Sequence, residues 1–389
     1  MKIFDLIRHH FEFVGISTTQ TTKHPFNVRN VAILVTFAQF FISSMAFLLF
    51  EAKTIREFAD SFYAAATTFG VSNVFIPNIF NMANIFQLID DSDAIIQKRC
   101  HTIFARDIYN HVIERTEKWS KRFHLIFVKI SLPGLVGPNF LITLFLCLTS
   151  DSGPDAFILP FPVLLPFDWR TPIGYLIAYL GQFGTFFGIL TLCCPAVCLY
   201  VGFCWLSMSF VRDIEQELSQ LNESNNKESL SHFHQRLKKI IQFHTDAKEL
   251  VYNFADIYKF PITPYYLWSV STICSSLLRI QMEMSQSNGK YFGMINPLFV
   301  IFWSVAQIYL FCDFGDNVTE KFSDINDAIY ECNWYSFPKE VQRIWPFVMV
   351  SAQQPLIIQG FGNIPCTRQA FKSVINGGFS YFTVLRKLQ

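Results

Sequence analysis

The stretch TPIGYLIAYLGQFGTFFGILTLCCPAVCLYVGFCWLSMSFV, residues 171–211, decides how this chain folds, because its 41 residues include no charged side chain. A helix needs about 20 consecutive apolar residues to cross the hydrocarbon core of a bilayer. The stretch is therefore long enough for one extended helix or for two crossings joined near Cys194 and Pro195. Either arrangement places the chain in a membrane.

The composition of the whole chain agrees with that reading. Of its 389 residues, 51% are hydrophobic and only 16% are charged, and the 44 phenylalanines are spread over the full length. Soluble domains carry about 25% charged residues. We therefore expect one membrane domain over residues 1–389. The net charge of +1, without a long basic run, does not favour a nucleic-acid partner.

Uncharged stretches of sufficient length predict an all-α protein with seven transmembrane helices. Their approximate ranges are 31–50, 61–89, 130–150, 171–211, 261–278, 291–312 and 345–388, the last one broken near 360–366. The segments that would then lie on one side hold 22 Lys and Arg, and the loops on the other side hold 5. The positive-inside rule puts the N-terminus in the cytoplasm and the C-terminus outside the cell. Two crossings within 171–211 would put the basic segment after Val211 outside the cell, so we expect one long helix there.

Signals for catalysis and for metal binding are weak. The chain shows no nucleophile elbow, Walker loop or carboxylate pair, and we expect no enzymatic activity and no cofactor. His232 and His234 lie two residues apart but have no Cys or carboxylate at ligand spacing, so we expect no metal site. None of the ten cysteines lies in an expected outer loop, which argues against a disulfide-tied rhodopsin-like receptor.

The expected outer loop between the third and fourth helices is rich in proline and aromatic residues. Five prolines lie between positions 154 and 172, with Phe157, Phe161, Phe167 and Trp169 among them. Proline disfavours helix, and the rings need cover from water. We interpret the segment as a stiff lid over a ligand cavity, with an apolar loop resting on the bilayer as the alternative.

The last helix carries the most informative pattern. Its first part ends at the break Gly360-Phe361-Gly362-Asn363-Ile364-Pro365, and only 13 uncharged residues, 373–385, follow before the final basic pair. At helical spacing, one stripe contains Ser373, Gly377, Ser380, Val384 and Leu388. Small and hydroxyl residues suit a wetted wall, and the two aliphatic residues suit a constriction that closes by dewetting. Packing between helices through small residues is the alternative interpretation.

The same region resembles the signature of insect odorant receptors. The resemblance runs from Gln354-Pro355 through Gly360, Asn363, Arg368 and Phe371 to Ser-Tyr-Phe-Thr-Val-Leu-Arg at 380–386. Weaker likeness covers the rest of the chain, in a style similar to mosquito receptors. A gustatory receptor of the same superfamily is the near alternative, although its usual last-helix motif lacks this form, and a G-protein-coupled receptor or transporter is the distant one.

That resemblance implies a heterotetrameric, nonselective cation channel formed with the olfactory co-receptor. Its place would be the plasma membrane of olfactory sensory neuron dendrites. It puts the gate at Val384 and Leu388 and a pore lining at Ser373, Gly377 and Ser380. The segment 212–259 lacks the long insertion of the co-receptor, so the chain is more similar to an odorant-tuned subunit.

The resemblance also implies an odorant pocket in the outer half of the helix bundle. From depth and helix face, we expect contributions from residues of the second, third and fourth helices: Phe69, Val71, Ser72, Phe140, Leu144, Tyr175, Tyr179 and Phe183. Such an aromatic cavity suits a small volatile, aromatic or heterocyclic, held by dispersion and one hydrogen bond. Tyr175 and Tyr179 are the candidate polar partners, and ordinary core packing is the alternative for each residue.

Overall fold

The computed structural model describes the chain as a set of long helices. The described residues are 4–13, 28–52, 57–59, 61, 62, 64, 65, 81–130, 133, 137, 140, 141, 143, 144, 147, 157–161, 163–224, 230–286 and 294–387. The α-helices are α1 (Asp5–Phe13), α2 (Val28–Ala46), α4 (Met82–Arg99), α5 (Ile103–His124), α7 (Pro172–Ser224), α8 (Leu230–Gln286), α9 (Ile295–Glu331), α10 (Lys339–Ala352) and α11 (Arg368–Lys387). Shorter π or 3-10 turns are η1 (Phe47–Glu51), η2 (Leu125–Ile130) and η5 (Trp334–Ser336).

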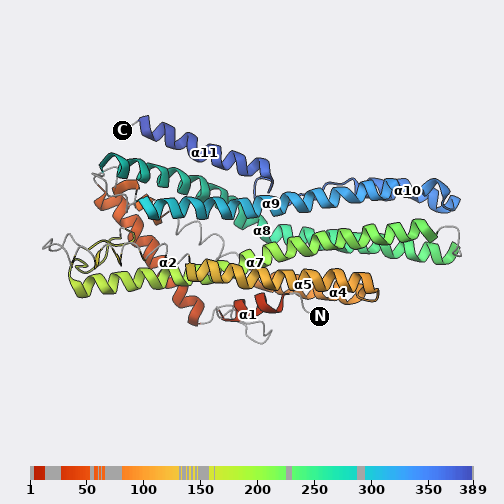
Figure 1. Ribbon diagram of the computed structural model, residues 1–389, viewed down its shortest axis with the longest axis horizontal. Helices are drawn as coiled ribbons and strands as arrows, with labels where there is room; N and C mark the ends of the chain where they lie inside the picture. Colours follow the sequence, from red (N-terminus) through yellow and green to blue (C-terminus); the bar gives the residue numbers. More distant parts are fainter. Residues whose placement is uncertain are drawn as a thin grey trace.

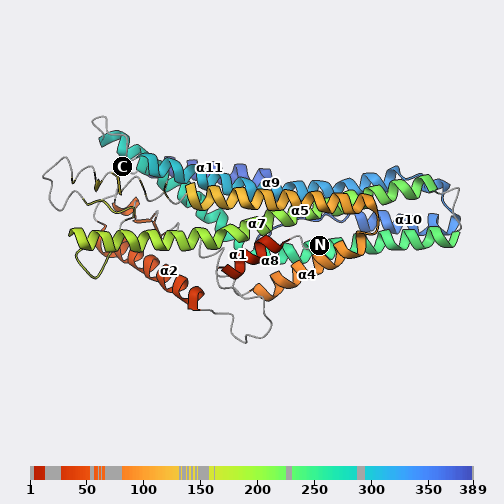
Figure 2. The same cartoon turned by 60° about the horizontal axis from the view of Figure 1, so that its bottom comes forward.

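The molecule is elongated, and its long helices lie side by side (Figure 1). At one end, α2 and α11 flank the start of α7, the end of α8 and the start of α9. We call this the α11 end. At the opposite end, α10 lies beside the junction of α7 and α8, and α4 and α5 lie toward it from the middle (Figure 2). We call this the α10 end.

The three central helices run well past the ranges expected for membrane crossings. α7 continues without a break through Pro195 and spans 53 residues, and α8 spans 57. The added turns carry alternating charged and apolar residues, which continue a helix whose apolar stripe packs on its neighbours. Within the described residues, two helical stretches, Cys194–Glu223 and Ile295–Glu331, are long and apolar enough to cross a membrane. Most of the expected helices 61–89 and 130–150 lies outside the described residues.

Aromatic side chains fill the centre where α7, α8 and α9 meet. The rings of Tyr200 and Phe311 lie 4.7 Å apart, and those of Phe203 and Phe254 stack at 4.3 Å. The Tyr200 hydroxyl donates to the Phe311 carbonyl oxygen at 2.9 Å. A buried hydroxyl needs such a partner because its desolvation is costly. These contacts make the middle of the three long helices a continuous dry core.

The N-terminal helix α1 closes this core from the side. Phe4, Ile7 and Phe11 are buried, at spacings that place them on one helical face. The Phe4 ring stacks on Phe203 with 6.3 Å between ring centroids. A Cβ atom at Gly202 would lie 3.0 Å from the Phe4 ring, so the close approach of α1 to α7 depends on that glycine.

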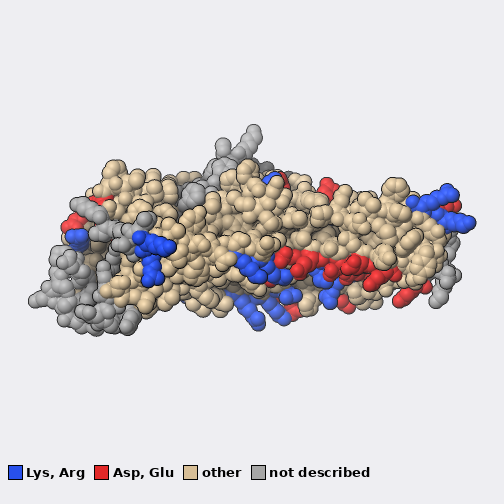
Figure 3. All heavy atoms as spheres, turned by 90° about the horizontal axis from the view of Figure 1, so that it is seen from above, with Lys and Arg blue, Asp and Glu red and all other residues tan. Residues whose placement is uncertain are grey.

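Charged residues are unevenly distributed over the surface. On the face shown in Figure 3, acidic side chains form a band along the middle of the molecule, with basic side chains beside it. A buried network ties α4 and α5 to the charged part of α7: Arg99 donates to Asp213 at 2.9 Å and to Glu217 at 2.8 Å. The Tyr109 hydroxyl donates to Asp213 at 2.8 Å. Burial and the Asp213 carboxylate raise the pKa of Tyr109, so its phenol remains a donor.

Candidate functional site

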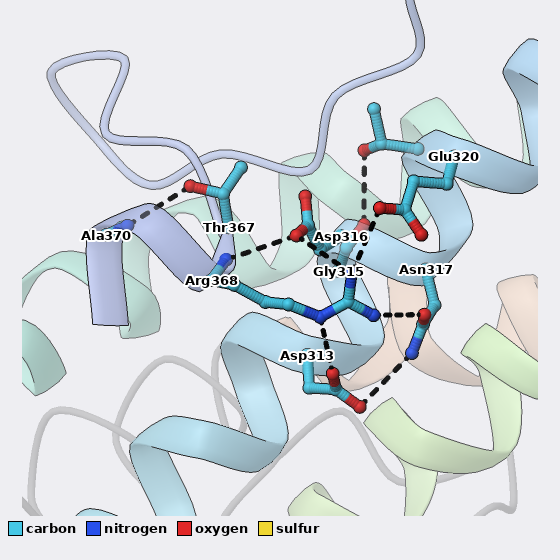
Figure 4. Close-up of polar contacts among 9 residues, drawn as sticks. Asp313, Gly315, Asp316, Asn317, Glu320, Thr367, Arg368 and Ala370 are labelled. Carbon is cyan, nitrogen blue, oxygen red and sulfur yellow. Dashed lines mark hydrogen bonds and ion pairs between the residues drawn. The ribbon is translucent and has the colours of Figure 1, made fainter. Parts of the chain in front are cut away.

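The first turn of α11 is fastened to α9 by one arginine. Arg368 Nε donates to Asp313 Oδ1 at 2.8 Å, Nη2 to Asn317 Oδ1 at 2.6 Å and Nη1 to Glu320 Oε1 at 3.0 Å (Figure 4). The Arg368 backbone N–H also donates to Asp316 Oδ2 at 3.3 Å. These four partners lie on one face of α9, at spacings of one and two helical turns. The planar guanidinium can satisfy several of them at once because it carries five donors.

Sequence reasoning included Arg368 in the family resemblance but assigned it no contact. The signal that could have identified its partners is the set of acidic and amide residues at 313, 316, 317 and 320, which a helix places together. A run of acidic residues is usually a solvated face. Which basic residue would meet it depends on where the chain returns after the break.

The break before α11 is a tight, hydrogen-bonded turn. Gln359 and Pro365 form an antiparallel bridge, and the Gly360 N–H donates to the Ile364 carbonyl at 2.7 Å. Gly362 and Asn363 have positive φ angles of 78° and 59°, a region that favours Gly and Asn. A Cβ atom at Gly360 would lie 2.5 Å from Thr263 Oγ1 of α8. The turn therefore holds the chain against α8 and redirects it into α11.

α11 packs on α8 through one side. Val374 and Gly378 are buried, and a Cβ atom at Gly378 would lie 2.8 Å from Ile273 Cγ2. The glycine thus allows the two helices to approach closely, as small residues do in membrane bundles. α11 also contacts α9, where the Phe371 ring lies 5.4 Å from that of Tyr309, and the faces turned away from both helices are exposed.

The stripe expected to line a pore lies largely on those remaining faces. Ser373 and Ser380 are exposed, Val384 is 57% exposed, and Gly377 is partly buried at the edge of the contact with α8. The Ser373 hydroxyl donates to the Gln369 carbonyl at 3.1 Å, so this polar group is satisfied within its own helix. Leu388 lies outside the described residues. The described members of the stripe are thus brought onto one side of α11.

At the α11 end, three of the residues expected to line an odorant pocket come together. The rings of Phe140 and Tyr179 lie 5.0 Å apart, and those of Tyr175 and Tyr179 lie 5.9 Å apart. Leu144 and Phe183 are exposed, at 47% and 38%. Phe69, Val71 and Ser72 lie outside the described residues. The aromatic group therefore consists of two tyrosines of α7 and one ring from the segment before the loop.

The hydroxyl of Tyr175 already contacts protein atoms. It lies 3.1 Å from Thr143 Oγ1 and 3.2 Å from the Ile158 carbonyl oxygen. The Ile158 N–H donates to the same Thr143 oxygen at 3.0 Å, and Phe157 lies 5.2 Å from the Tyr175 ring. This triad joins α7, the segment before the loop and the loop itself. Sequence reasoning missed Thr143, because only the fold shows which hydroxyl faces Tyr175.

The proline-rich loop is held against α7 by a second polar contact. The amide of Gln182 accepts from the Phe161 N–H at 3.2 Å and donates to the Phe161 carbonyl at 2.9 Å. The Phe161 ring is fully buried and stacks on Phe186 at 4.6 Å. On the other side, the Leu164 N–H donates to the Ser43 carbonyl of α2 at 3.2 Å. The described part of the loop is thus wedged between α2 and α7. The sequence signal for this contact was Gln182, a polar residue within the uncharged stretch 171–211.

His232 and His234 lie near the start of α8. Among the described residues, no three His, Cys, Asp or Glu side chains gather in a way that could hold a metal ion.

Comparison with known proteins identifies the family. Residues 54–379 match the family described as 7tm odorant receptors. The chain therefore belongs to the insect odorant receptor family, whose members are multi-pass membrane proteins and not enzymes.

Individual relatives are distant and are matched in part. Odorant receptor 94a of Drosophila melanogaster is 24% identical over 70% of this chain and 66% of its own length. Odorant receptor Or2 of Anopheles gambiae is 26% identical over 50% of this chain and 53% of its own. The odorant receptor coreceptor of Harpegnathos saltator is 27% identical over 39% of this chain and 31% of its own. The chain thus matches less than two thirds of the length of each of these relatives.

One solved structure matches almost the whole chain. The insect olfactory receptor OR5 from Machilis hrabei, determined in complex with eugenol, superposes with a TM-score of 0.79, covering 99% of this chain and 98% of that one at 13% identity. A second structure of the same receptor gives a TM-score of 0.75. The expectation of an all-helical, seven-span receptor fold is confirmed.

Proposed function

We propose that this chain is the odorant-binding subunit of a ligand-gated, nonselective cation channel formed with the olfactory co-receptor. The observation that carries the proposal is α11: it is anchored by Arg368 at one end and packed on α8 along one side. Its small and hydroxyl side chains remain on the faces that a single subunit leaves uncovered. A symmetric assembly would turn such faces toward a shared axis.

In the assembly, Ser373, Gly377 and Ser380 line the pore, and Val384 with Leu388 forms its gate. The hydroxyl groups provide a wetted wall for passing cations, and the two aliphatic side chains close it by excluding water. The exposure of Val384 in the single subunit supports this role. The N-terminus lies in the cytoplasm, consistent with the distribution of basic residues.

The ligand of the aromatic group at the α11 end is a small aromatic or heterocyclic volatile. Phe140 supplies apolar surface, and Tyr175 and Tyr179 supply aromatic rings and the candidate hydroxyl partners. The complex of the Machilis receptor with eugenol, a receptor of the same fold, supports an aromatic ligand. Binding opens the pore only insofar as the ligand binds the open arrangement more tightly. The plasma membrane of olfactory neuron dendrites is the proposed location.

Whole-cell recording tests the proposal. Cells expressing this chain with an insect olfactory co-receptor are compared with cells expressing either protein alone, using a panel of aromatic and heterocyclic volatiles. We expect a volatile-evoked inward current that requires this chain and does not require G proteins. Absence of current over the whole panel, with both proteins present at the cell surface, would contradict the proposal.

A further inference from the structure

A cavity lies at the α11 end, and neither Tyr175 nor Tyr179 lines it. Its volume is about 180 Å³, and its walls come from α2, from loop residues 163–167 and from α7. Engineered apolar cavities of about 150 Å³ bind benzene. The space is therefore sufficient for a molecule with one ring.

The cavity is built from apolar walls with a few polar groups. Phe40 of α2 and Val163 of the loop are buried and form the inner wall, with Ala178 of α7 beside them. The Phe40 ring meets Phe186 at 5.5 Å and Phe161 at 6.0 Å in edge-on contacts, which hold the inner wall in place. Small-molecule sites commonly combine such walls with a small number of fixed polar groups.

Polar side chains from α2 and α7 also line the cavity. The amide of Gln182 is engaged with both backbone groups of Phe161, and the Thr185 hydroxyl donates to the Gly181 carbonyl at 2.9 Å. Gln39 lies at the exposed mouth, halfway along α2. A polar side chain at membrane depth is costly when it faces lipid. An amide here can both donate to and accept from a ligand.

We propose that this cavity is a second small-molecule site, which takes a benzene-sized, mostly apolar molecule with one hydrogen-bonding group, seated on Phe40 and bonded to Gln39. The site is separate from the aromatic group of Tyr175 and Tyr179. Both sites share the loop, because Ile158 contacts Tyr175 while Val163 and Leu165 line the cavity. An occupant therefore stabilises the loop conformation that the first site also uses.

Two glycines of α7 allow a matched test. A Cβ atom at Gly181 or at Gly184 would meet no heavy atom within 4 Å, so larger side chains fit at both positions. Only Gly181 lines the cavity. Gly181→Leu therefore fills the cavity, and Gly184→Leu adds the same side chain less than one turn away without entering it. Both replacements also raise helix propensity.

The experiment measures binding of 4-fluorobenzyl alcohol to the purified full-length chain in lipid nanodiscs by ¹⁹F NMR. We expect two bound ¹⁹F signals, one for each site, in wild type and in Gly184→Leu, and at least tenfold weaker binding for one of the two signals in Gly181→Leu. Gln39→Leu should weaken binding about fivefold, the effect of losing one neutral hydrogen bond, while leaving 4-fluorotoluene unaffected. Because no current is recorded, the result is independent of the proposed channel function.

Two outcomes would overturn the second site. Equal binding of the probe to wild type, Gly181→Leu and Gly184→Leu would show that the cavity does not hold it. Binding that occurs in detergent and disappears in nanodiscs would assign the cavity to a phospholipid acyl chain instead.

Discussion

The neighbouring glycines Gly377 and Gly378 of α11 should respond in opposite directions to the same substitution. A Cβ atom at Gly378 would lie 2.8 Å from Ile273 Cγ2 and 3.0 Å from Ile273 Cβ, which is too close without movement of α8. A Cβ atom at Gly377 would lie 3.6 Å from Val270 Cγ2, an ordinary van der Waals contact. The two positions are adjacent in the sequence and both carry glycine, so only the packing around them differs.

The expected magnitudes follow from two opposing effects. Replacing glycine by alanine inside a helix stabilises it by about 1 kcal/mol, because the unfolded chain loses conformational freedom. Overpacking a close contact costs about 1–3 kcal/mol. We therefore expect Gly377→Ala to stabilise the seating of α11 by about 1 kcal/mol. Gly378→Ala should be neutral or destabilising by up to about 2 kcal/mol.

Two quantities are measured. The first is the melting temperature of the purified assembly, monitored by fluorescence-detected size-exclusion chromatography. The second is the volatile concentration that gives half-maximal current. Gly378→Ala should leave the melting temperature unchanged or lower it. A destabilisation of about 1.4 kcal/mol would also shift the half-maximal concentration, since that energy changes a conformational equilibrium tenfold. Gly377→Ala should raise the melting temperature. A shift in the same direction for both variants would refute the packing argument.

Three further predictions concern the contacts of Arg368 with α9, the buried side chain of His244 and the N-terminal helix α1. Arg368→Gln should shift the half-maximal volatile concentration about tenfold or abolish current, because it leaves acidic partners unpaired, whereas Lys372→Gln, one turn later, should change it less than twofold. Burial lowers the pKa of His244 to about 4, so the folded protein holds it neutral while the unfolded chain protonates near 6.5. About 3 kcal/mol of folding stability should therefore be present above pH 6.5 and be lost as the pH falls toward 4. His244→Gln should reduce the change of melting temperature with pH over this window. An unchanged pH dependence in this variant would contradict the assignment. Phe4→Ala should cost about 3 kcal/mol of α1 packing, seen as faster hydrogen exchange over residues 4–13 with α9 unaffected; unchanged exchange would show that the stack on Phe203 does not hold α1.

Sequence reasoning succeeded where a single physical constraint dominates. An uncharged stretch such as 171–211 fits only a membrane or a large core, and the distribution of basic residues then favours one long helix over two crossings. The motif at 380–386 indicated the family, because it resembles the signature of insect odorant receptors. The stripe from Ser373 to Val384 followed from helical spacing. Ser373, Ser380 and Val384 are exposed and Gly377 lies at the edge of the contact with α8, and the pore-lining role of the stripe stays a prediction.

The same reasoning could not reach features that depend on how distant segments meet. Arg368 and its partners on α9 are about 50 residues apart, and the turn at Gly360–Asn363 determines where they meet. The cavity beside Gln39 exists only because the loop is wedged between α2 and α7. The extents of α7 and α8 were also underestimated, because hydropathy reports where a helix enters lipid and not where it ends.

The sequence by itself thus determined that the chain lies in a membrane, that it is all-helical and which family it resembles. These properties depend on composition, local periodicity and a contiguous motif. Only the tertiary structure decided which acids hold Arg368, which glycine of α11 touches α8, and which face of α7 borders a second cavity. Those features are set by side chains that lie far apart along the chain and come within a few ångströms of one another in the fold. Their energies depend on distance and burial, which no local pattern encodes.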